Sequence, residues 1–269
     1  MTAGPGSTVL RIADTRVQVE SQGSGDPFLL VHSLLTGPEA FAEIAESLAR
    51  RYRVYRLSLP GFGHSDPLPG DTVSIYDLAD HVNAAMEALG LGPDATVLGN
   101  GLGGFVAVAL AIRHGSGFRR LIVANAGAGF SEERTAAFHV MSRRVAEGGM
   151  TAVVDIAVQR IFPPVYIESN PEVIEERRAV LASIDPGAFA AACRALARTD
   201  LRPGLGSIGN DTLVVVGEAD ATTPPEMGRE LAVGIPRARL AALSGCGHCP
   251  QIQAPGELLA AIERFIDDA

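Results

Sequence analysis

A glycine-rich turn at residues 99–104 carries the most specific chemical patterns in this sequence. It reads Gly-Asn-Gly-Leu-Gly-Gly and lies between an apolar run and a helical pattern. Gly99, Gly101 and Gly104 match G-x-G-x-x-G, which cradles a dinucleotide pyrophosphate at the start of a helix. That motif expects an acidic residue about 20 positions later for the ribose. Residues 95–131 contain no Asp or Glu, so dinucleotide binding is disfavoured.

The same turn also fits a nucleophile elbow, the G-x-S-x-G motif that exposes a serine on a sharp strand-to-helix turn. In this chain the serine position of the motif is Gly101. Glycine has no hydroxyl group, so residue 101 cannot attack a carbonyl or carry an acyl group. Glycine accepts the strained backbone of an elbow at a lower cost than serine, and we expect the fold around it to be intact.

A second chemical pattern is Cys246-Gly-His-Cys249, which has the spacing of a redox pair or of half a zinc site. Cys193 is the only other cysteine, and an odd number of cysteines argues against a complete disulfide framework. The histidines on the expected helices have no partner at metal-ligand spacing. We therefore predict no metal site.

The composition excludes several reaction classes. All 22 basic residues are arginine, and the chain has no lysine. A lysine Schiff base, the usual pyridoxal phosphate site and a phosphate-binding loop with its lysine are therefore ruled out. The formal net charge of −9 argues against a broad surface for nucleic acid or an anionic membrane. We predict neither as a partner.

The length of 269 residues, 30 of them glycine, suits a single large α/β unit rich in tight turns. Residues 1–8 contain neither a basic nor an apolar leader segment, and no apolar run reaches the roughly 20 residues of a membrane span. We therefore expect a cytoplasmic protein. The sequence leaves the oligomeric state open, a homo-oligomer included.

Strand and helix patterns alternate along the first half of the chain. Residues 8–12 and 16–20 are expected to form a hairpin. Buried-strand patterns occur at 27–32, 52–57, 95–100 and 119–126. Helical patterns occur at 38–50, 74–89 and 101–115. This alternation predicts βαβ crossovers and a mainly parallel sheet with helices on both faces.

The alternation stops after Gly129, and residues 130–206 show helical periodicity interrupted by several prolines. Strand patterns resume at 211–218 and 238–243, with helical patterns at 225–234 and 255–268. We predict an α/β core interrupted by an all-helical cap that covers the carboxyl ends of the strands. The predicted bounds are 1–129 and 207–269 for the core and 130–206 for the cap.

Five motifs occur in the order found in α/β-hydrolases. They are PFLLVHSLLTG, LPGFGHSDP, LGNGLGG, VVVGEADATTPP and GCGHCPQIQAP. With them the chain resembles the α/β-hydrolase superfamily over nearly its whole length, and the 3-oxoadipate enol-lactonase-like group in particular. The resemblance implies an α/β-hydrolase fold. The chain departs from the family at the elbow, where Gly101 replaces the nucleophilic serine.

The resemblance also implies roles for single residues. The family's acid follows the strand after the cap, which maps to Asp220, and its general base lies in a late G-x-G-H loop, which maps to His248. The oxyanion hole uses two backbone N–H groups, which map to Leu34 and Leu102. We expect a pocket between cap and core that is lined by Leu34, Gly101, Leu102, Asp220 and His248. It would accept a small, mostly apolar carbonyl compound, an ester, lactone or enol, and would need no cofactor.

Three explanations for Gly101 stay open. In the first, which we favour, Gly101 is native, and a dyad of His248 and Asp220 works without a covalent intermediate. This covers water-mediated hydrolysis, cyclisation, isomerisation and carbon–carbon cleavage. In the second, the chain is an inactivated Ser-to-Gly variant of a serine ester or lactone hydrolase. In the third, it is a non-catalytic ligand binder on the same scaffold, which the retained dyad argues against.

A few further side chains are candidates for the site. Ser33 lies in the expected oxyanion loop, and we interpret its hydroxyl as a partner of local backbone, with substrate binding or a substitute nucleophile as alternatives. A thiol of Cys246 or Cys249 is a weaker candidate nucleophile. The cap arginines are interpreted as a solvated face, in which Arg144 and Arg194 are our candidates for a substrate carboxylate, as the resemblance suggests.

Overall fold

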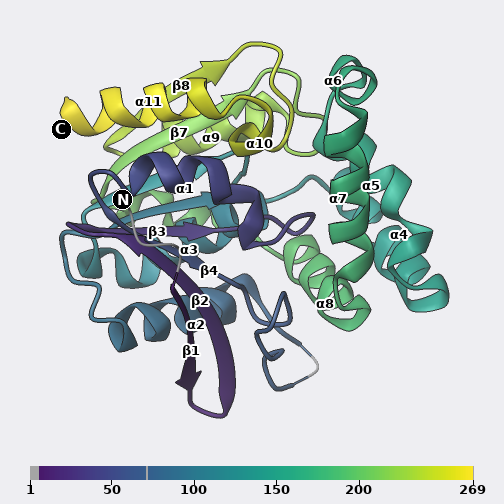
Figure 1. Ribbon diagram of the computed structural model, residues 1–269, viewed down its shortest axis with the longest axis horizontal. Coiled ribbons are helices and arrows are strands. Elements are labelled where there is room, and N and C mark those ends of the chain that lie inside the picture. The colour runs from purple at the N-terminus through teal and green to yellow at the C-terminus, as the bar shows by residue number, and fades with distance from the viewer. Residues whose placement is uncertain (1–5, 71, 269) are drawn as a thin grey trace.

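An eight-stranded sheet runs through the molecule (Figure 1). The computed structural model describes residues 6–70 and 72–268, so most of the N-terminal stretch examined for a leader lies outside the described residues. The strands are β1 (Gly6–Ile12), β2 (Thr15–Gly23), β3 (Pro27–Val31), β4 (Arg53–Leu57), β5 (Thr96–Asn100), β6 (Arg120–Ala124), β7 (Asp211–Gly217) and β8 (Ala238–Leu243). Their order is β1-β2-β4-β3-β5-β6-β7-β8, with all neighbours from β4 onward parallel. The predicted parallel sheet and N-terminal hairpin are confirmed.

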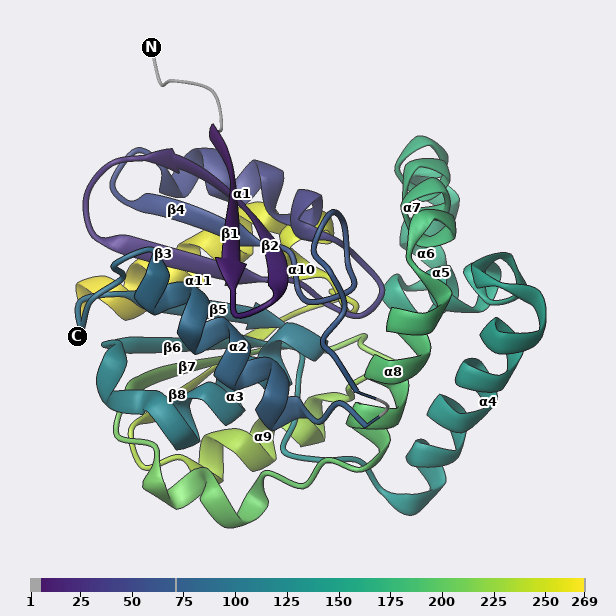
Figure 2. The ribbon, with the colours of Figure 1, turned by 90° about the horizontal axis from the view of Figure 1, so that it is seen from below.

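Helices cover both faces of this sheet (Figure 2). One face packs against α1 (Ala42–Leu48) and α11 (Pro255–Asp267), and the other packs against α2 (Ile75–Ala88), α3 (Leu102–His114) and α9 (Pro225–Gly234). Every residue of β5 and β6 is buried, which explains why these strands appear in the sequence as continuous apolar runs.

Two local predictions differ from the structure. The helix expected at 38–50 is a 3-10 turn, Pro38–Phe41, followed by the shorter α1. The structure also contains a four-residue helix, α10 (Pro250–Gln253), that was not predicted. Four residues are too few to show helical periodicity, so the pattern gave no signal there.

A run of helices separates β6 from β7, and we call residues 130–206 the helical cap. Its α-helices are α4 (Glu132–Gly148), α5 (Val154–Ile161), α6 (Pro164–Ser169), α7 (Pro171–Ser183) and α8 (Pro186–Ala197). The last three each begin at a proline, whose fixed φ and missing N–H suit the first turn of a helix. Prolines that interrupt the periodic pattern are therefore helix starts.

The helical cap stands beside the carboxyl edge of the sheet, as Figure 1 and Figure 2 show. Arg177 of α7, whose side chain is buried, donates a hydrogen bond to Glu39 Oε1 at 3.0 Å and so joins the cap to the segment before α1. No single described helix is long and apolar enough to cross a membrane, although α7 and α8, which meet at 93°, pass that test as a bent pair.

Candidate active site

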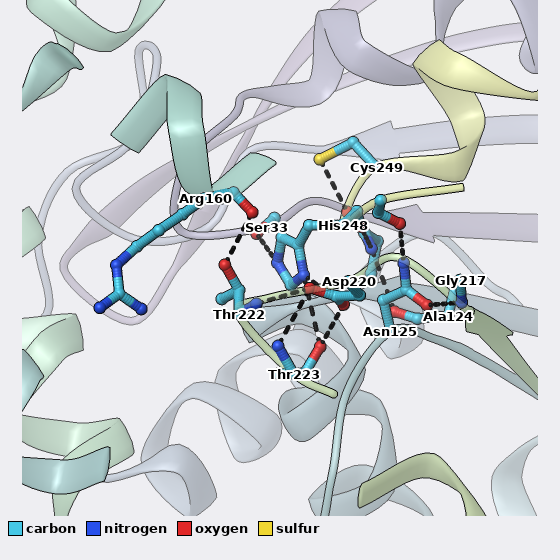
Figure 3. Close-up of polar contacts among 12 residues, drawn as sticks. Ser33, Ala124, Asn125, Arg160, Gly217, Asp220, Thr222, Thr223, His248 and Cys249 are labelled. Atoms are coloured by element: carbon cyan, nitrogen blue, oxygen red, sulfur yellow. Dashed lines mark hydrogen bonds and ion pairs between the residues drawn. The ribbon is translucent and has the colours of Figure 1, made fainter. Parts of the chain in front are cut away.

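Four loops at the carboxyl edge of the sheet bring the candidate residues together. Ser33 follows β3, Gly101 follows β5, Asp220 follows β7 and His248 follows β8. Parallel strands end at the same edge, so residues far apart in the sequence meet there. Figure 3 shows Ser33 and Asp220 on either side of the His248 ring.

His248 and Asp220 form a buried hydrogen-bonded pair. His248 Nδ1 lies 2.9 Å from Asp220 Oδ2. The Asp220 carboxylate also accepts hydrogen bonds from the N–H groups of Thr222 at 2.7 Å and Thr223 at 3.1 Å, and from the Thr223 hydroxyl at 2.7 Å. An ionised carboxylate can only accept, so His248 carries its proton on Nδ1. Its Nε2 is then free to act as a base.

Two buried asparagines hold the loops of this pair. Asn100, at the end of β5, donates a hydrogen bond to the backbone oxygen of His248 at 2.9 Å. Asn125, just after β6, donates to the backbone oxygen of Gly247 at 2.6 Å and accepts from the N–H of Gly217 at 2.7 Å. Asn125 has a φ of 49°, a left-handed conformation that asparagine tolerates better than most residues. Sequence reasoning missed both, because a lone asparagine at a strand end looks like an ordinary turn residue.

The elbow between β5 and α3 is closely packed. Gly101 has a φ of 54° and a ψ of −120°, and its N–H donates to the backbone oxygen of Ala124 at 3.1 Å. A Cβ atom at Gly99 would overlap the backbone of Gly103, and one at Gly103 would overlap the backbone of Val31. Close backbone approach therefore accounts for Gly99, which also matched the dinucleotide motif, and for Gly103.

Ser33 occupies the space beside Gly101. Its side chain is fully buried, and its Oγ lies 3.3 Å from His248 Nε2. A Cβ atom built on Gly101 would overlap Ser33 Oγ and would lie 2.7 Å from His248 Nε2. The interpretation of this hydroxyl as a partner of local backbone is therefore wrong, because it faces the candidate base.

A small inner cavity lies next to Gly101 and His248. Its volume is about 30 Å³, and Leu34 and Leu102 are among the residues that line it. The backbone N–H groups of these two leucines make no hydrogen bond within the described part of the chain, so they are free to hold an oxyanion. Asp220 does not line this cavity, although the sequence led us to expect it there.

A wider outer cavity of about 530 Å³ adjoins the inner one, and the two share Phe130, Phe138, Arg160 and Thr222 in their linings. The guanidinium group of Arg160 points away from the His248 ring (Figure 3). Among the described residues it has no ion-pair partner. Sequence reasoning missed Arg160, because its place at the cavity depends on how α5 packs against the core.

Arg144 and Arg194, the arginines predicted to bind a carboxylate, line neither of these two cavities. Arg144 is exposed on α4. Arg194 lies on α8 and lines a separate pocket with Phe62 and Leu68 among its neighbours. Helical periodicity located these helices in the sequence, but it did not show which face of each turns toward the site.

The two cysteines of the CxxC pattern are buried and free. Burial raises the pKa of Cys246 to about 12 and the pKa of Cys249 well above its usual value, so both thiols stay protonated near neutral pH. Cys249 Sγ lies 3.6 Å from Asn100 Oδ1. Neither cysteine is suited to act as a nucleophile. Across residues 6–70 and 72–268, no group of three His, Cys, Asp or Glu side chains is placed to hold a metal ion.

Comparison with known proteins identifies a family. Residues 28–262 match the alpha/beta hydrolase family. The 3-oxoadipate enol-lactonase 2 of Acinetobacter baylyi is 32% identical over 79% of this chain and 78% of that protein. The 2-hydroxymuconate semialdehyde hydrolase of Pseudomonas sp. strain CF600 is 32% identical over 96% of this chain and 92% of that protein. The solved enol-lactonase from Burkholderia xenovorans LB400 matches with a TM-score of 0.91 at 27% identity, covering 97% of this chain and 100% of that one.

This chain therefore belongs to the alpha/beta hydrolase family. Its fold is the α/β-hydrolase fold predicted from the sequence, and the relatives and structural neighbours named above are hydrolase enzymes. The turn between β5 and α3, where the sequence suggested an elbow, carries Gly101 and has no side-chain hydroxyl at that position.

Proposed function

We propose that this enzyme hydrolyses a small ester or lactone without a hydroxyl group at residue 101. The observation that carries the proposal is the position of His248 Nε2, which faces Ser33 Oγ and the space beside Gly101 while Asp220 holds Nδ1 at 2.9 Å. A buried imidazole fixed in one tautomer can take a proton from an attacking oxygen atom. The names of two relatives, an enol-lactonase and a semialdehyde hydrolase, support a carbonyl substrate.

In the proposed reaction, His248 takes the proton of the attacking O–H group, and Asp220 stabilises the resulting cation. The carbonyl carbon becomes tetrahedral, and its oxygen gains negative charge. The N–H groups of Leu34 and Leu102 would receive this oxyanion. The proton on His248 then passes to the leaving oxygen as its bond to carbon breaks. These groups carry the reaction without a cofactor.

Two oxygen atoms can serve as the attacking group. The sequence favours chemistry without a covalent intermediate, in which hydrolysis uses water, and the inner cavity of about 30 Å³ has room for one or two water molecules. The hydroxyl of Ser33, 3.3 Å from His248 Nε2, is the other. Both routes require His248 as the base, so the proposed function does not depend on the choice between them.

The two cavities suggest where each part of the substrate would lie. The inner cavity accepts little more than the reacting carbonyl group, so the rest of the substrate would lie in the outer cavity of about 530 Å³. Arg160 lines both and could pair there with a substrate carboxylate. Of the side chains that the sequence suggested for substrate binding, Ser33 lines the inner cavity, whereas Arg144 and Arg194 do not.

An inactivated serine hydrolase is less well supported. A serine at residue 101 would place its Cβ against Ser33 Oγ, and Ser33 would have to move. A non-catalytic binder would have no need of the buried pair of His248 and Asp220. A cytoplasmic location, and the expectation that nucleic acids and membranes are not partners, stay predictions from the sequence.

Steady-state hydrolysis of aryl acetates and of a small enol-lactone tests the proposal. We expect turnover by the chain as it stands, and a fall in kcat of roughly 10³-fold or more in His248→Ala and in Asp220→Asn. His139→Ala, at an exposed position on α4, is the matched control and should keep full activity. Equal activity in His248→Ala would contradict the proposal. Binding of a substrate analogue without turnover of any carbonyl compound would favour the binder instead.

A further inference from the structure

We propose that Ser33 is the nucleophile of this enzyme and attacks the substrate carbonyl from the strand next to the elbow. This inference rests on the function proposed above and specifies which oxygen atom His248 activates. The sequence offers Ser33 as a nucleophile only as an alternative, because no motif marks a serine after β3 in that role.

The register of the sheet places Ser33 beside Gly101. Strands β3 and β5 are parallel, hydrogen-bonded neighbours, with Val31 opposite Gly99. Two residues further along each chain, Ser33 and Gly101 come level at the carboxyl edge. Neighbouring strands lie about 4.8 Å apart, so a short side chain from one can reach the space above the other.

A side chain at residue 101 would compete with the Ser33 hydroxyl for the space beside His248. A Cβ atom at Gly101 would overlap Ser33 Oγ and would lie 3.0 Å from Ser33 Cβ. The hydroxyl of Ser33 therefore fills the space that the first atoms of an elbow side chain would take. Because residue 101 has no side chain, this space beside His248 is left to Ser33 Oγ.

Hydrogen bonds fix the backbone of Ser33 in this position. His32 Nδ1 donates to the Ser33 backbone oxygen at 2.8 Å, and the Ser33 N–H donates to Thr36 Oγ1 at 3.2 Å. The other ring nitrogen of His32, Nε2, accepts from the Leu59 N–H at 3.0 Å. Burial lowers the pKa of His32, which keeps the ring neutral and able both to donate and to accept. A nucleophile held this way needs little reorganisation before it reacts.

The hydroxyl of Ser33 has only one hydrogen-bond partner among the described residues, namely His248 Nε2. A structural serine in a buried loop usually bonds to nearby backbone instead. The separation of 3.3 Å is somewhat long for an O–H···N hydrogen bond, as is common for nucleophile and base before substrate binds. The position of Ser33 Oγ beside His248 Nε2, and the lack of any other partner for this hydroxyl among the described residues, together indicate a nucleophile and its base.

The covalent step balances with the groups present. Ser33 Oγ bonds to the substrate carbonyl carbon while its proton passes to His248 Nε2. The oxyanion forms against the N–H groups of Leu34 and Leu102. Collapse breaks the bond to the leaving oxygen, which takes the proton from His248 and leaves an acyl group on Ser33. A water molecule, deprotonated by His248, then releases the acid and returns the proton to Ser33.

Covalent labelling tests the proposal directly. The protein is incubated with a fluorophosphonate, and the labelled residue is located by peptide mass mapping with fragmentation. We expect one adduct, on Ser33, that disappears in Ser33→Ala and in His248→Ala. Ser24→Ala, which changes an exposed serine in the loop before β3, should label like the parent. An adduct on a different residue, or ester hydrolysis by a protein that takes up no label, would overturn the proposal.

Moving the hydroxyl group from residue 33 to residue 101 and measuring kcat provides a second test. Ser33→Gly should lower kcat by roughly 10³-fold or more. Adding Gly101→Ser to that variant should recover at least 10-fold of the loss, because the hydroxyl returns to His248 from the neighbouring strand. If Ser33→Gly keeps kcat while His248→Ala abolishes it, water is the attacking group, so this inference fails and the proposed function stands. If His248→Ala is also active, both fail.

Discussion

The loops that carry Asp220 and His248 differ from the helical cap in how they are held. The loops are joined by buried hydrogen bonds, such as those of Asn125 at 2.6 and 2.7 Å. On its α4 side, the helical cap meets the core through an exposed ion pair, Arg134 with Glu226, whose side chains are 41% and 65% exposed. Buried bonds are costly to leave unmade, whereas exposed pairs contribute little to stability.

This contrast separates two tasks within one enzyme. The reacting groups need a fixed geometry, since a shift of about 1 Å can cost two orders of magnitude in rate. The residues that contact the rest of the substrate can vary without disturbing that geometry. Under the proposed function, the loops at the carboxyl edge would therefore set the chemistry, and the cap would select the substrate.

The largest expected effect tests the buried hydrogen bonds that hold the loops of Asp220 and His248. Asn125→Ala should lower the free energy of unfolding by about 3–5 kcal/mol, because two buried backbone groups lose their partners and alanine resists a positive φ. It should also lower kcat, since the loops of Asp220 and His248 loosen. Denaturant unfolding and aryl acetate kinetics measure both. Asn83→Ala, which removes an exposed amide on α2, should cost less than about 0.5 kcal/mol. Similar losses in the two variants would contradict the comparison.

A smaller effect tests the cap. Arg160→Gln should raise KM for an ester that carries a carboxylate by roughly 10- to 100-fold, because one charge-assisted contact is lost, and should leave kcat nearly unchanged. A neutral ester of the same size should show no change. Arg144→Gln, at an exposed position, is the control. If that control raises KM and Arg160→Gln does not, the outer cavity has been assigned to the wrong arginine.

The smallest effect concerns an exposed pair at the edge of the core. The Arg16 guanidinium, 2.7 Å from Asp66, lowers the pKa of Asp66 from 3.8 to about 2. A carboxyl group with a lowered folded pKa adds stability above the unfolded pKa and loses it as pH falls toward the folded one. Asp66→Asn should therefore lower Tm slightly at pH 6, and the difference should shrink between pH 4 and pH 2. Arg16→Gln should behave alike, and a pH-independent difference in thermal melts would argue against the pair.

Much of the fold could be predicted from the sequence. Short apolar runs such as residues 121–124, which alternate with helical patterns, are typical of strands buried on both faces in a parallel sheet between helices. The departures are local. Residues 38–50 form a 3-10 turn and a short helix, and α10 is too short to leave a periodic signal.

The candidate site was predictable only in part. Asp220 and His248 stand in family motifs, so the resemblance located them without any knowledge of distances. The direction of the Ser33 hydroxyl depends on the register of β3 against β5, and the place of Arg160 depends on how α5 docks. Strand pairing and helix packing join parts of the chain that are distant in the sequence. Local sequence patterns carry no information about which parts will meet.

The overlap between Ser33 Oγ and a side chain at residue 101 also bears on how such a site could arise or revert. A lineage that moves the hydroxyl between these strands must change two codons. One intermediate carries two crowded serines, and the other carries none and lacks a side-chain nucleophile there. Under the proposal for Ser33, either intermediate should be less active than the starting enzyme. A protein that carries the hydroxyl on one of these strands is therefore expected to keep it there as the surrounding sequence diverges.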